Sequence, residues 1–317
     1  MLHPHPHAPL RFGVIVNPNA FGVRRRRGIA GELRAIVGER GEVVETRGEE
    51  DLAEAAARFV RAGVNVVATC GGDGTNLTTL TALVRAYGPE RLPRFALLRG
   101  GTVNTVAANL GVRGDPPAVL GAVLRRLDSG TEIVRRQDLL VVNGMVGFLF
   151  AAGMGTRFLE AYYGGLGPGL GWAGLLAART VASSLVVGPF ARRLFAPVEL
   201  ALELDGERAP REMSAPKFII ASTVPDVGLG MRVAWRAGSE PGRFHVVASG
   251  LSTVEMAMQI QRVRHGQPLD GAPHLDEMAS HARLTFASTE TFTLDGELFR
   301  ARTVEIACGP ALEVLVP

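Results

Sequence analysis

The sequence predicts an α/β nucleotide-binding domain with a doubly wound, mostly parallel sheet, followed by a β-rich, sandwich-like second domain. Two observations support this prediction. Apolar strand patterns alternate with helix patterns as far as about residue 130, which is typical of a parallel sheet. Beyond that point the chain is mostly strand-like, and the stretch VELALEL (198–204) alternates apolar and polar residues, as a half-buried antiparallel strand does.

The first domain is predicted over residues 10–134. Helix boundaries carry the expected residues, because Gly63 follows one helix while Asp115 and Pro116 open another. Short apolar runs predict strands at 11–17, 41–46, 64–70 and 94–98. The predicted helices lie at 32–37, at 50–63, from Thr75 to about Tyr87, and at 115–130.

The second domain is predicted over residues 135–317, with an apolar insert at 155–195. Residues 165–191 are the most apolar part, but Arg179 and several Gly and Pro residues interrupt them, so we expect one or two amphipathic helices and no membrane span. The last strand, about 303–317, is a candidate to pack back on the first domain. The predicted strands lie at 132–136, 139–143, 146–152, 197–205, 217–223, 243–249, 283–288, 291–295, 303–308 and 312–316.

Composition narrows the class of protein. The chain has 47% hydrophobic and 21% charged residues, so it can bury a core. Its formal net charge is +3 and no basic stripe carries interleaved aromatic residues, so we expect no nucleic-acid partner. Cys70 and Cys308 form no disulfide or zinc pattern, and the first ten residues lack the apolar core of a signal peptide. We therefore expect a cytoplasmic protein.

The stretch ATCGGDGT joins a predicted strand to a predicted helix. Gly71, Gly72 and Gly74 would permit positive φ angles and a close approach of phosphate to the backbone. Thr75 would cap the helix. Asp73 would repel phosphate unless a Mg²⁺ ion offset its charge, so this residue favours metal-assisted phosphoryl transfer. A tight turn without function is the alternative, and the stretch alone does not decide between the two.

Two further predicted strands of the first domain also end in turn residues. Asn17 opens an Asn-Pro turn, while Gly101, Thr102 and Asn104 form a second glycine junction. Because the carboxyl ends of parallel strands meet at one sheet edge, we expect these residues to lie beside the first glycine junction. Late in the chain, the stretch TLDGEL places Glu297 beside a glycine.

Together these motifs resemble those of the diacylglycerol kinase catalytic family, which includes bacterial lipid kinases, sphingosine kinases and ceramide kinases. The nucleotide-binding half of that family is related to NAD kinases. The resemblance covers about residues 11–317, and the set of motifs is specific although each is weak alone. The matching motifs, in chain order, are Asn17-Pro18…Gly22, Gly71–Thr75, Gly101–Asn104, Asp138 and Asp295–Glu297.

The resemblance implies an ATP- and Mg²⁺-dependent lipid kinase, in which a lipid hydroxyl attacks the γ-phosphoryl group. It implies Glu297 as the general base and Asp73 as a second catalytic residue, with Asp73 and Asp138 as metal ligands. Diacylglycerol is the expected substrate, and a sphingoid base or ceramide is the alternative. The nucleotide-binding residues that the resemblance implies are Asn17, Thr46, Gly71, Gly72, Gly74, Thr75, Gly101, Thr102 and Asn104.

The chain departs from the family at acidic positions. Leu77 and Thr78 replace an Asn-Glu pair, while Thr105 and Pro241 replace two acids that support a structural Mg²⁺ ion in some bacterial members. We expect that this ion is absent or that its site is rebuilt with Glu240. The losses leave two other functions open: an NAD-kinase-like enzyme, and a catalytically decayed protein that binds nucleotide or lipid.

Three charged stretches allow more than one interpretation. The earlier LDGER stretch offers Glu207 as a rival base, but its Asp-Gly pair predicts a hairpin turn, so we favour Glu297. The arginines at 24–27 could contact ATP phosphates, face an anionic membrane or be solvated. Arg192 and Arg193 lie beside the apolar insert and favour a helix at a membrane surface. A helix packed on the β-rich domain is the alternative. We therefore expect peripheral membrane association and a membrane lipid as substrate.

Overall fold

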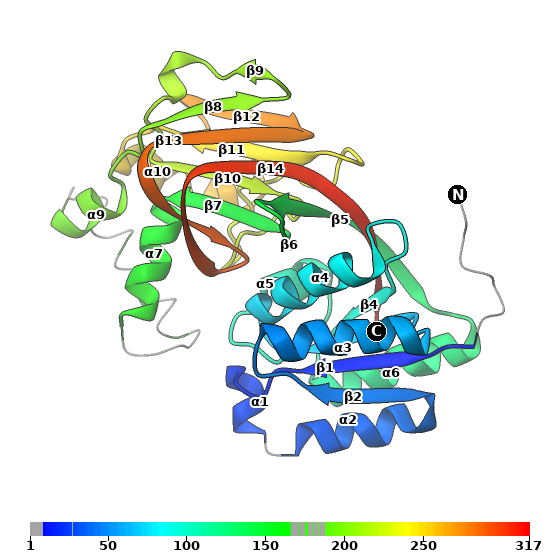
Figure 1. Ribbon diagram of the computed structural model, residues 1–317. Helices are drawn as coiled ribbons and strands as arrows, with labels where there is room; N and C mark the ends of the chain where they lie inside the picture. The colour runs from blue at the N-terminus through cyan, green and yellow to red at the C-terminus, as the bar shows by residue number, and fades with distance from the viewer. Residues whose placement is uncertain are drawn as a thin grey trace. The chain divides into compact units, whose positions relative to one another are not determined.

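The computed structural model describes residues 9–26, 28–165, 171, 175–176, 180, 183 and 188–317 (Figure 1). The chain divides into two compact units. Unit 1 contains residues up to Arg136 and the C-terminal segment Leu312–Pro317, and unit 2 contains Gln137–Ala311. The predicted combination of an α/β part and a β-rich part is confirmed.

Unit 1 is built on a parallel sheet with the strand order β14-β4-β3-β1-β2. Register is set by pairs such as Phe12 with Val66 in β1–β3 and Val314 with Phe95 in β14–β4. Every residue of β1 and β3 is buried, as expected for strands covered on both faces. The bounds are β1 Phe12–Val16, β2 Gly41–Glu45, β3 Val66–Cys70 and β4 Arg94–Leu97, and β14 enters this sheet with the end of Glu297–Val316.

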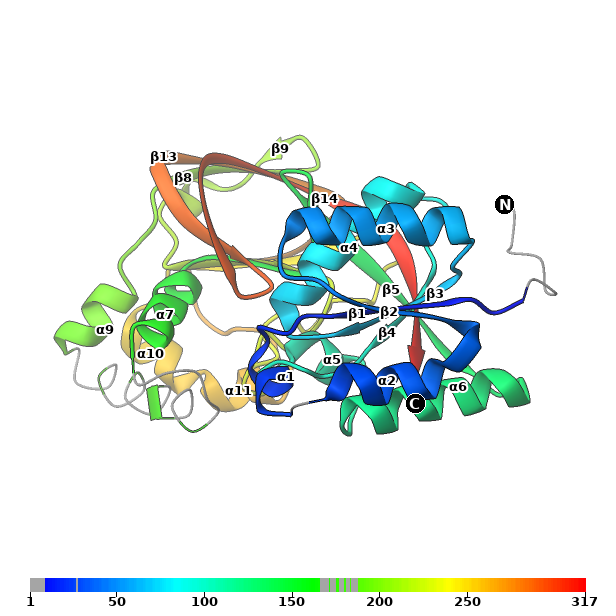
Figure 2. The same cartoon turned by 60° about the horizontal axis from the view of Figure 1, so that its bottom comes forward.

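Helices cover both faces of this sheet, with α3 and α4 on one side and α2 and α6 on the other (Figure 2). Gly63 ends α3 in the left-handed conformation, as predicted. Asp115 lies at the N-cap of α6, but its side chain makes no capping bond and pairs with Arg26 instead. The bounds are α1 Phe21–Arg25, α2 Ile29–Val37, η1 Gly38–Arg40, α3 Glu49–Ala62, α4 Asp73–Tyr87, α5 Thr105–Asn109 and α6 Pro116–Ser129.

Unit 2 is dominated by antiparallel strands in the order β12-β11-β10-β7-β13-β14, with β8 paired to both β13 and β9 and with β5 paired to β14 and β6. Three predictions of separate strands were wrong, because β5, β13 and β14 each run without a break through two predicted strands. The bounds are β5 Ile133–Val142, β6 Met145–Gly147, β7 Leu149–Gly153, β8 Leu200–Leu204, β9 Glu207–Arg208, β10 Phe218–Ser222, β11 Phe244–Ser249, β12 His274–Ala279, β13 His281–Leu294 and β14 Glu297–Val316.

Short helices lie beside the strands of unit 2, and the apolar insert contributes α7 and α9. These two helices contact each other, and Phe158 and Phe190 pack around the buried Tyr162. Much of the predicted amphipathic segment 165–191 lies outside the described residues. No helix in the described part of the chain is long and apolar enough to cross a membrane. The bounds are α7 Met154–Tyr163, α9 Pro189–Leu194, η2 Arg211–Met213, α10 Thr253–Met258 and α11 Ile260–Arg264.

Candidate active site

Backbone hydrogen bonds join three loops at the carboxyl ends of β1, β3 and β4. The Asn17 N–H donates to the Cys70 carbonyl at 3.0 Å, which ties the first loop to the second. The Gly100 N–H donates to the Gly71 carbonyl at 2.8 Å, and the Gly22 N–H donates to the Gly100 carbonyl at 2.9 Å. The expected meeting of these motifs at one sheet edge is therefore confirmed within unit 1.

Glycine is required in these loops because the backbones nearly touch. A Cβ atom at Gly101 would lie 2.4 Å from the Gly72 Cα, and one at Gly71 would lie 2.3 Å from the Thr75 Oγ1. Neither these glycines nor Gly72 and Gly74 have positive φ, so the loops do not use the conformational freedom that glycine permits there. Asn104 adopts that conformation instead, with φ of 54°. The glycines thus permit the loops to pack against each other.

Thr75 and Asn17 connect the first two loops through their side chains. The Asn17 Nδ2 donates to the Thr75 Oγ1 at 2.9 Å, and Thr75 is buried. The prediction that Thr75 caps the helix was wrong, because α4 begins at Asp73 and Gly72 is its N-cap. The helix begins earlier than predicted, and this places Thr75 in its first turn with the hydroxyl turned to Asn17.

Asp73 joins the two glycine junctions. Its Oδ2 accepts from the Thr105 N–H at 2.9 Å and its Oδ1 accepts from the Val106 N–H at 3.1 Å, at the start of α5. Burial raises the pKa of the Asp73 carboxyl, against the opposing effect of these N–H groups and of the nearby Arg99 guanidinium. Asp73 therefore has a structural role that sequence reasoning missed: it caps the helix that follows the second junction.

The remaining predicted residues of unit 1 lie in these loops or next to them. Asn104 closes its own loop, because its Oδ1 accepts from the Gly101 N–H and its Nδ2 donates to the Gly101 carbonyl, each at 2.9 Å. Thr102 lies within that loop and is partly exposed. Thr46 is buried after β2, and its N–H donates to the Val16 carbonyl at 3.0 Å. A nucleotide-binding role for each stays a prediction.

Glu297 lies in unit 2, at the end of a tight hairpin between β13 and β14. Asp295 and Gly296 have φ of 49° and 88°, which is the pattern of a type I′ turn. The Asp295 carboxylate is buried and accepts from the Phe148 N–H at 3.1 Å and the Leu149 N–H at 2.9 Å. Glu297 is exposed, and its side chain makes no hydrogen bond or ion pair with any residue that the structure describes.

The earlier LDGER stretch forms the predicted hairpin, between β8 and β9. Asp205 and Gly206 have φ of 49° and 86°. The Asp205 Oδ1 accepts from the N–H groups of Ser280 and His281, each at 2.9 Å, and its Oδ2 contacts Arg243 Nη2 at 2.6 Å. Glu207 is exposed in this hairpin. The two LDGE copies therefore share one turn geometry.

The third predicted carboxylate, Asp138, lies in β5 of unit 2. Its Oδ2 accepts from the Gly242 N–H at 2.8 Å, and its charge contributes to raising the pKa of the Cys308 thiol to about 11, after the larger effect of burial. Asp138 therefore fixes the loop that precedes β11. No hydrogen bond links Asp138 to Glu297 among the described residues.

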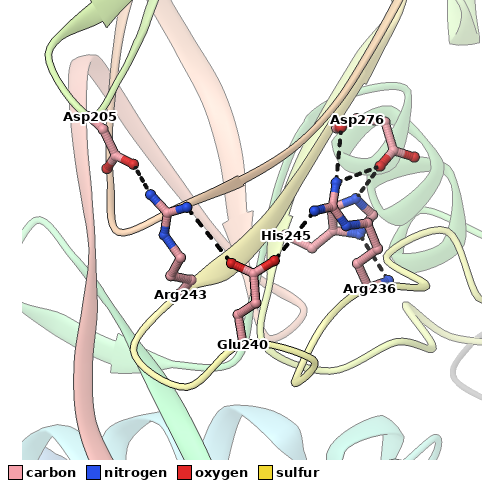
Figure 3. Close-up of polar contacts among 6 residues, drawn as sticks. All are labelled: Asp205, Arg236, Glu240, Arg243, His245 and Asp276. Carbon is pink, nitrogen blue, oxygen red and sulfur yellow. Dashed lines mark hydrogen bonds and ion pairs between the residues drawn. The ribbon is translucent and has the colours of Figure 1, made fainter.

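Residues 235–245 carry a charge network that sequence reasoning did not predict (Figure 3). The Glu240 carboxylate lies between two guanidinium groups, 3.4 Å from Arg236 Nη2 and 3.8 Å from Arg243 Nη1. Arg236 also reaches Asp276, which accepts from the buried His245 Nε2 at 2.8 Å. Glu240 was our candidate for a rebuilt magnesium site, but in the structure this carboxylate is neutralised by arginine.

Part of the chain is similar to a known protein family. Residues 11–135, which contain the three loops, match the family model of the diacylglycerol kinase catalytic domain. Over these residues the chain is similar to that family. The resemblance that the motifs predicted is confirmed.

Two known proteins resemble the chain along most of its length. The "Probable lipid kinase YegS-like" of Stenotrophomonas maltophilia (strain K279a) is 25% identical over 312 residues, which cover 95% of this chain and 94% of that protein. A crystal structure of a diacylglycerol kinase from Bacillus anthracis str. Sterne has a TM-score of 0.64 at 13% identity and covers 97% of each chain. At this identity the structural likeness shows the fold alone.

The Asp73 carboxylate keeps acceptor capacity that a metal–nucleotide complex could use. A carboxylate has about four acceptor sites, and Asp73 uses two of them for backbone N–H groups. No group of three potential metal-ligating side chains occurs among the described residues. Magnesium in kinases commonly takes one or two carboxylates together with nucleotide phosphates, so a metal-binding role for Asp73 and for Asp138 stays a prediction.

Proposed function

We propose that this protein transfers the γ-phosphoryl group of ATP to a hydroxyl group of a membrane lipid, with diacylglycerol as acceptor and phosphatidic acid as product. The observation that carries the proposal is the set of three interlocked loops at the sheet edge, within the residues that match the diacylglycerol kinase catalytic domain. The full-length likeness to a relative named as a lipid kinase supports a lipid acceptor.

The loops are suited to hold the phosphates of ATP. The helix α4 is 15 residues long and begins directly after Gly72, so its dipole and free N–H groups favour an anion there. The bonds that join the loops keep this end of the helix in place. Binding at a rigid, preformed site reduces the ordering cost of holding a flexible triphosphate.

Glu297 is the residue that we assign as general base. Its carboxylate would accept the proton of the lipid hydroxyl as the hydroxyl oxygen bonds to the γ-phosphorus. The bond from that phosphorus to the β–γ bridging oxygen breaks, and ADP leaves with the electron pair. The buried Asp295 supports this role, because its bonds to Phe148 and Leu149 fix the turn that presents Glu297. An exposed carboxylate held in this way can meet an acceptor at the protein surface.

A magnesium ion bound with the nucleotide would neutralise phosphate charge, and Asp73 and Asp138 are the residues that we assign to hold it. Without the metal, Asp73 still caps α5. We therefore expect removal of metal to abolish transfer while the fold of unit 1 is retained.

A lipid acceptor requires the protein to reach a membrane surface, and we propose that it does so peripherally. Phe158 on α7 and Phe190 on α9 are only partly buried where they pack around Tyr162, and Arg192 and Arg193 lie exposed on α9. Helices that bind an anionic membrane interface combine apolar side chains with arginines in this way. We therefore propose that the lipid binds to unit 2.

An assay with labelled ATP, Mg²⁺ and mixed micelles tests the proposal. Diacylglycerol, ceramide, sphingosine and NAD are offered as separate acceptors. Label on diacylglycerol is the expected result. Label on ceramide or sphingosine alone would change the substrate, label on NAD alone would indicate an NAD-kinase-like enzyme, and intact ATP binding without any transfer would indicate a decayed enzyme.

A further inference from the structure

The charge of a bound triphosphate must be offset in unit 1 without lysine. Lys217 is the only lysine of the chain, and it lies in unit 2, where its Nζ donates to the Leu251 carbonyl at 2.7 Å. Backbone N–H groups and a metal ion supply part of the opposing charge. Any cationic side chain of unit 1 that contacts phosphate must therefore be an arginine or a histidine.

Several arginines of unit 1 already have partners. Arg26 pairs with Glu32 at 2.6 Å and also with Asp115, and the Arg25 guanidinium lies 4.8 Å from the centre of the Phe21 ring. Two of the four arginines at 24–27 therefore have partners within the protein. Arg27 lies outside the described residues.

Arg99 differs from these arginines. It follows β4 and comes directly before Gly100, whose N–H and carbonyl both bond to the neighbouring loops. Its Nε is buried and makes no hydrogen bond within the part of the chain that the structure describes. An N–H donor that is buried without a partner is rare in native proteins and points to a group that binds there.

The surroundings of Arg99 also indicate an anion. The positive charge of Arg99 opposes the rise in the pKa of the Asp73 carboxyl that burial causes. Both oxygens of Asp73 nevertheless accept from the backbone of α5, and no bond joins them to Arg99. Arg99 precedes Gly100, whose N–H bonds to the Gly71 carbonyl just before α4. A guanidinium at such a place can form two parallel hydrogen bonds to phosphate oxygens.

We propose that the Arg99 guanidinium binds a phosphate group of the nucleotide at the junction of the two glycine loops. This inference rests on the proposed function. Arg99 would be a binding residue in addition to those that the motifs imply. Its charge would balance Asp73 before the nucleotide arrives and would offset phosphate charge afterwards.

The test compares Arg99→Gln with Arg85→Gln, a control that removes the same charge from the exposed last turn of α4. Calorimetry gives the dissociation constants of ATP, ADP, AMP and adenosine with Mg²⁺ present. We expect Arg99→Gln to weaken ATP binding by about 10- to 100-fold, the usual value of a charge-assisted hydrogen bond, and to leave adenosine binding unchanged. The member of the series at which the loss disappears identifies the phosphate.

Two further measurements separate binding from folding. Arg99→Lys keeps the charge without the guanidinium fork, so its ATP affinity should fall between wild type and Arg99→Gln. Ligand-free Arg99→Gln loses no hydrogen bond of the buried Nε, only the charge effect on Asp73, so its unfolding temperature should fall only slightly. Equal loss of ATP and adenosine binding with a large fall in unfolding temperature would show a structural role and overturn the inference.

The inference and the proposed function can fail separately. If wild type and Arg99→Gln bind ATP equally well, the assignment of Arg99 is wrong and the kinase proposal is unaffected. If the wild-type protein binds no nucleotide, the proposed function fails and the inference fails with it.

Discussion

The two LDGE copies, at 204–207 and 294–297, fold alike but differ in their surroundings. Both hairpins pair leucine with glutamate, and both have an aspartate at φ of 49° followed by a glycine at positive φ. In each, the aspartate accepts two backbone N–H groups. Asp295, however, is buried, whereas Asp205 is exposed and paired with Arg243.

This comparison shows that turn geometry does not by itself identify a catalytic glutamate. The sequence DGE builds a stable hairpin wherever a neighbouring strand offers two N–H groups to the aspartate. We assign catalysis to the second copy because of its place in the motif order, and the structure adds a buried anchor for the turn.

The largest expected effect is on activity. We expect Glu297→Gln to lower kcat by about 10²- to 10⁴-fold, the usual contribution of a general base, because an amide cannot accept the lipid proton. Glu207→Gln is the matched control in the other copy and should retain wild-type kcat. Steady-state assays with labelled ATP and diacylglycerol micelles provide both values. Equal losses in the two variants would contradict the assignment.

The next effect is on stability. We expect Asp295→Ala to lower the free energy of unfolding by about 2–4 kcal/mol, because it leaves the N–H groups of buried Phe148 and partly buried Leu149 without their acceptor. Asp205→Ala should cost only about 1 kcal/mol, since water can reach its partners. Urea unfolding of both variants measures the difference. A larger loss in Asp205→Ala would show that burial does not distinguish the two turns.

The glycines test the shared backbone conformation. Gly206 and Gly296 have φ of 86° and 88°, so an alanine at either position is forced into the left-handed region at about 1–2 kcal/mol. A new Cβ would meet nothing within 4 Å at Gly206, and at Gly296 only the Tyr163 Oη at 3.8 Å. We therefore expect Gly206→Ala and Gly296→Ala to lower the free energy of unfolding equally. A difference above about 1 kcal/mol would contradict identical turns.

The smallest effect concerns pH. Burial alone would raise the pKa of Asp205, but hydrogen bonds from Ser280 and His281 and the charge of Arg243 together lower it. A lowered pKa in the folded state stabilises the protein above the unfolded value of about 3.9, and this contribution disappears as the pH falls through the folded pKa. The stability of wild type should therefore fall more steeply below pH ~4 than that of Asp205→Asn. Parallel curves in thermal unfolding between pH 3 and 7 would contradict this.

Much of unit 1 could be predicted from the sequence, because buried parallel strands appear as continuous apolar runs such as Phe12–Val16 and Val66–Cys70. The capping role of Asp73 could not be predicted, since its partner Thr105 lies 32 residues away and the contact depends on the fold. The charge network around Glu240 could not be predicted either, because its contacts also depend on the fold.

The prediction for the long strand β14 was wrong for a different reason. Gly309 and Pro310 predict a break between two strands, because proline lacks an N–H and glycine weakens a strand. In the structure β14 continues through both residues, and a Cβ at Gly309 would lie 3.0 Å from the Val141 Cγ2 of the neighbouring β5. Tertiary packing therefore overrides the local preference.

We propose that the two units have different roles: the loops of unit 1 bind the nucleotide, and Glu297 of unit 2 takes the proton of the acceptor. The most direct test is the dissociation constant of ATP for Glu297→Gln, measured on the preparation that has lost transfer. The account predicts a value equal to that of wild type. A dissociation constant that rises in parallel with the loss of kcat would contradict it, because Glu297 would then act in nucleotide binding.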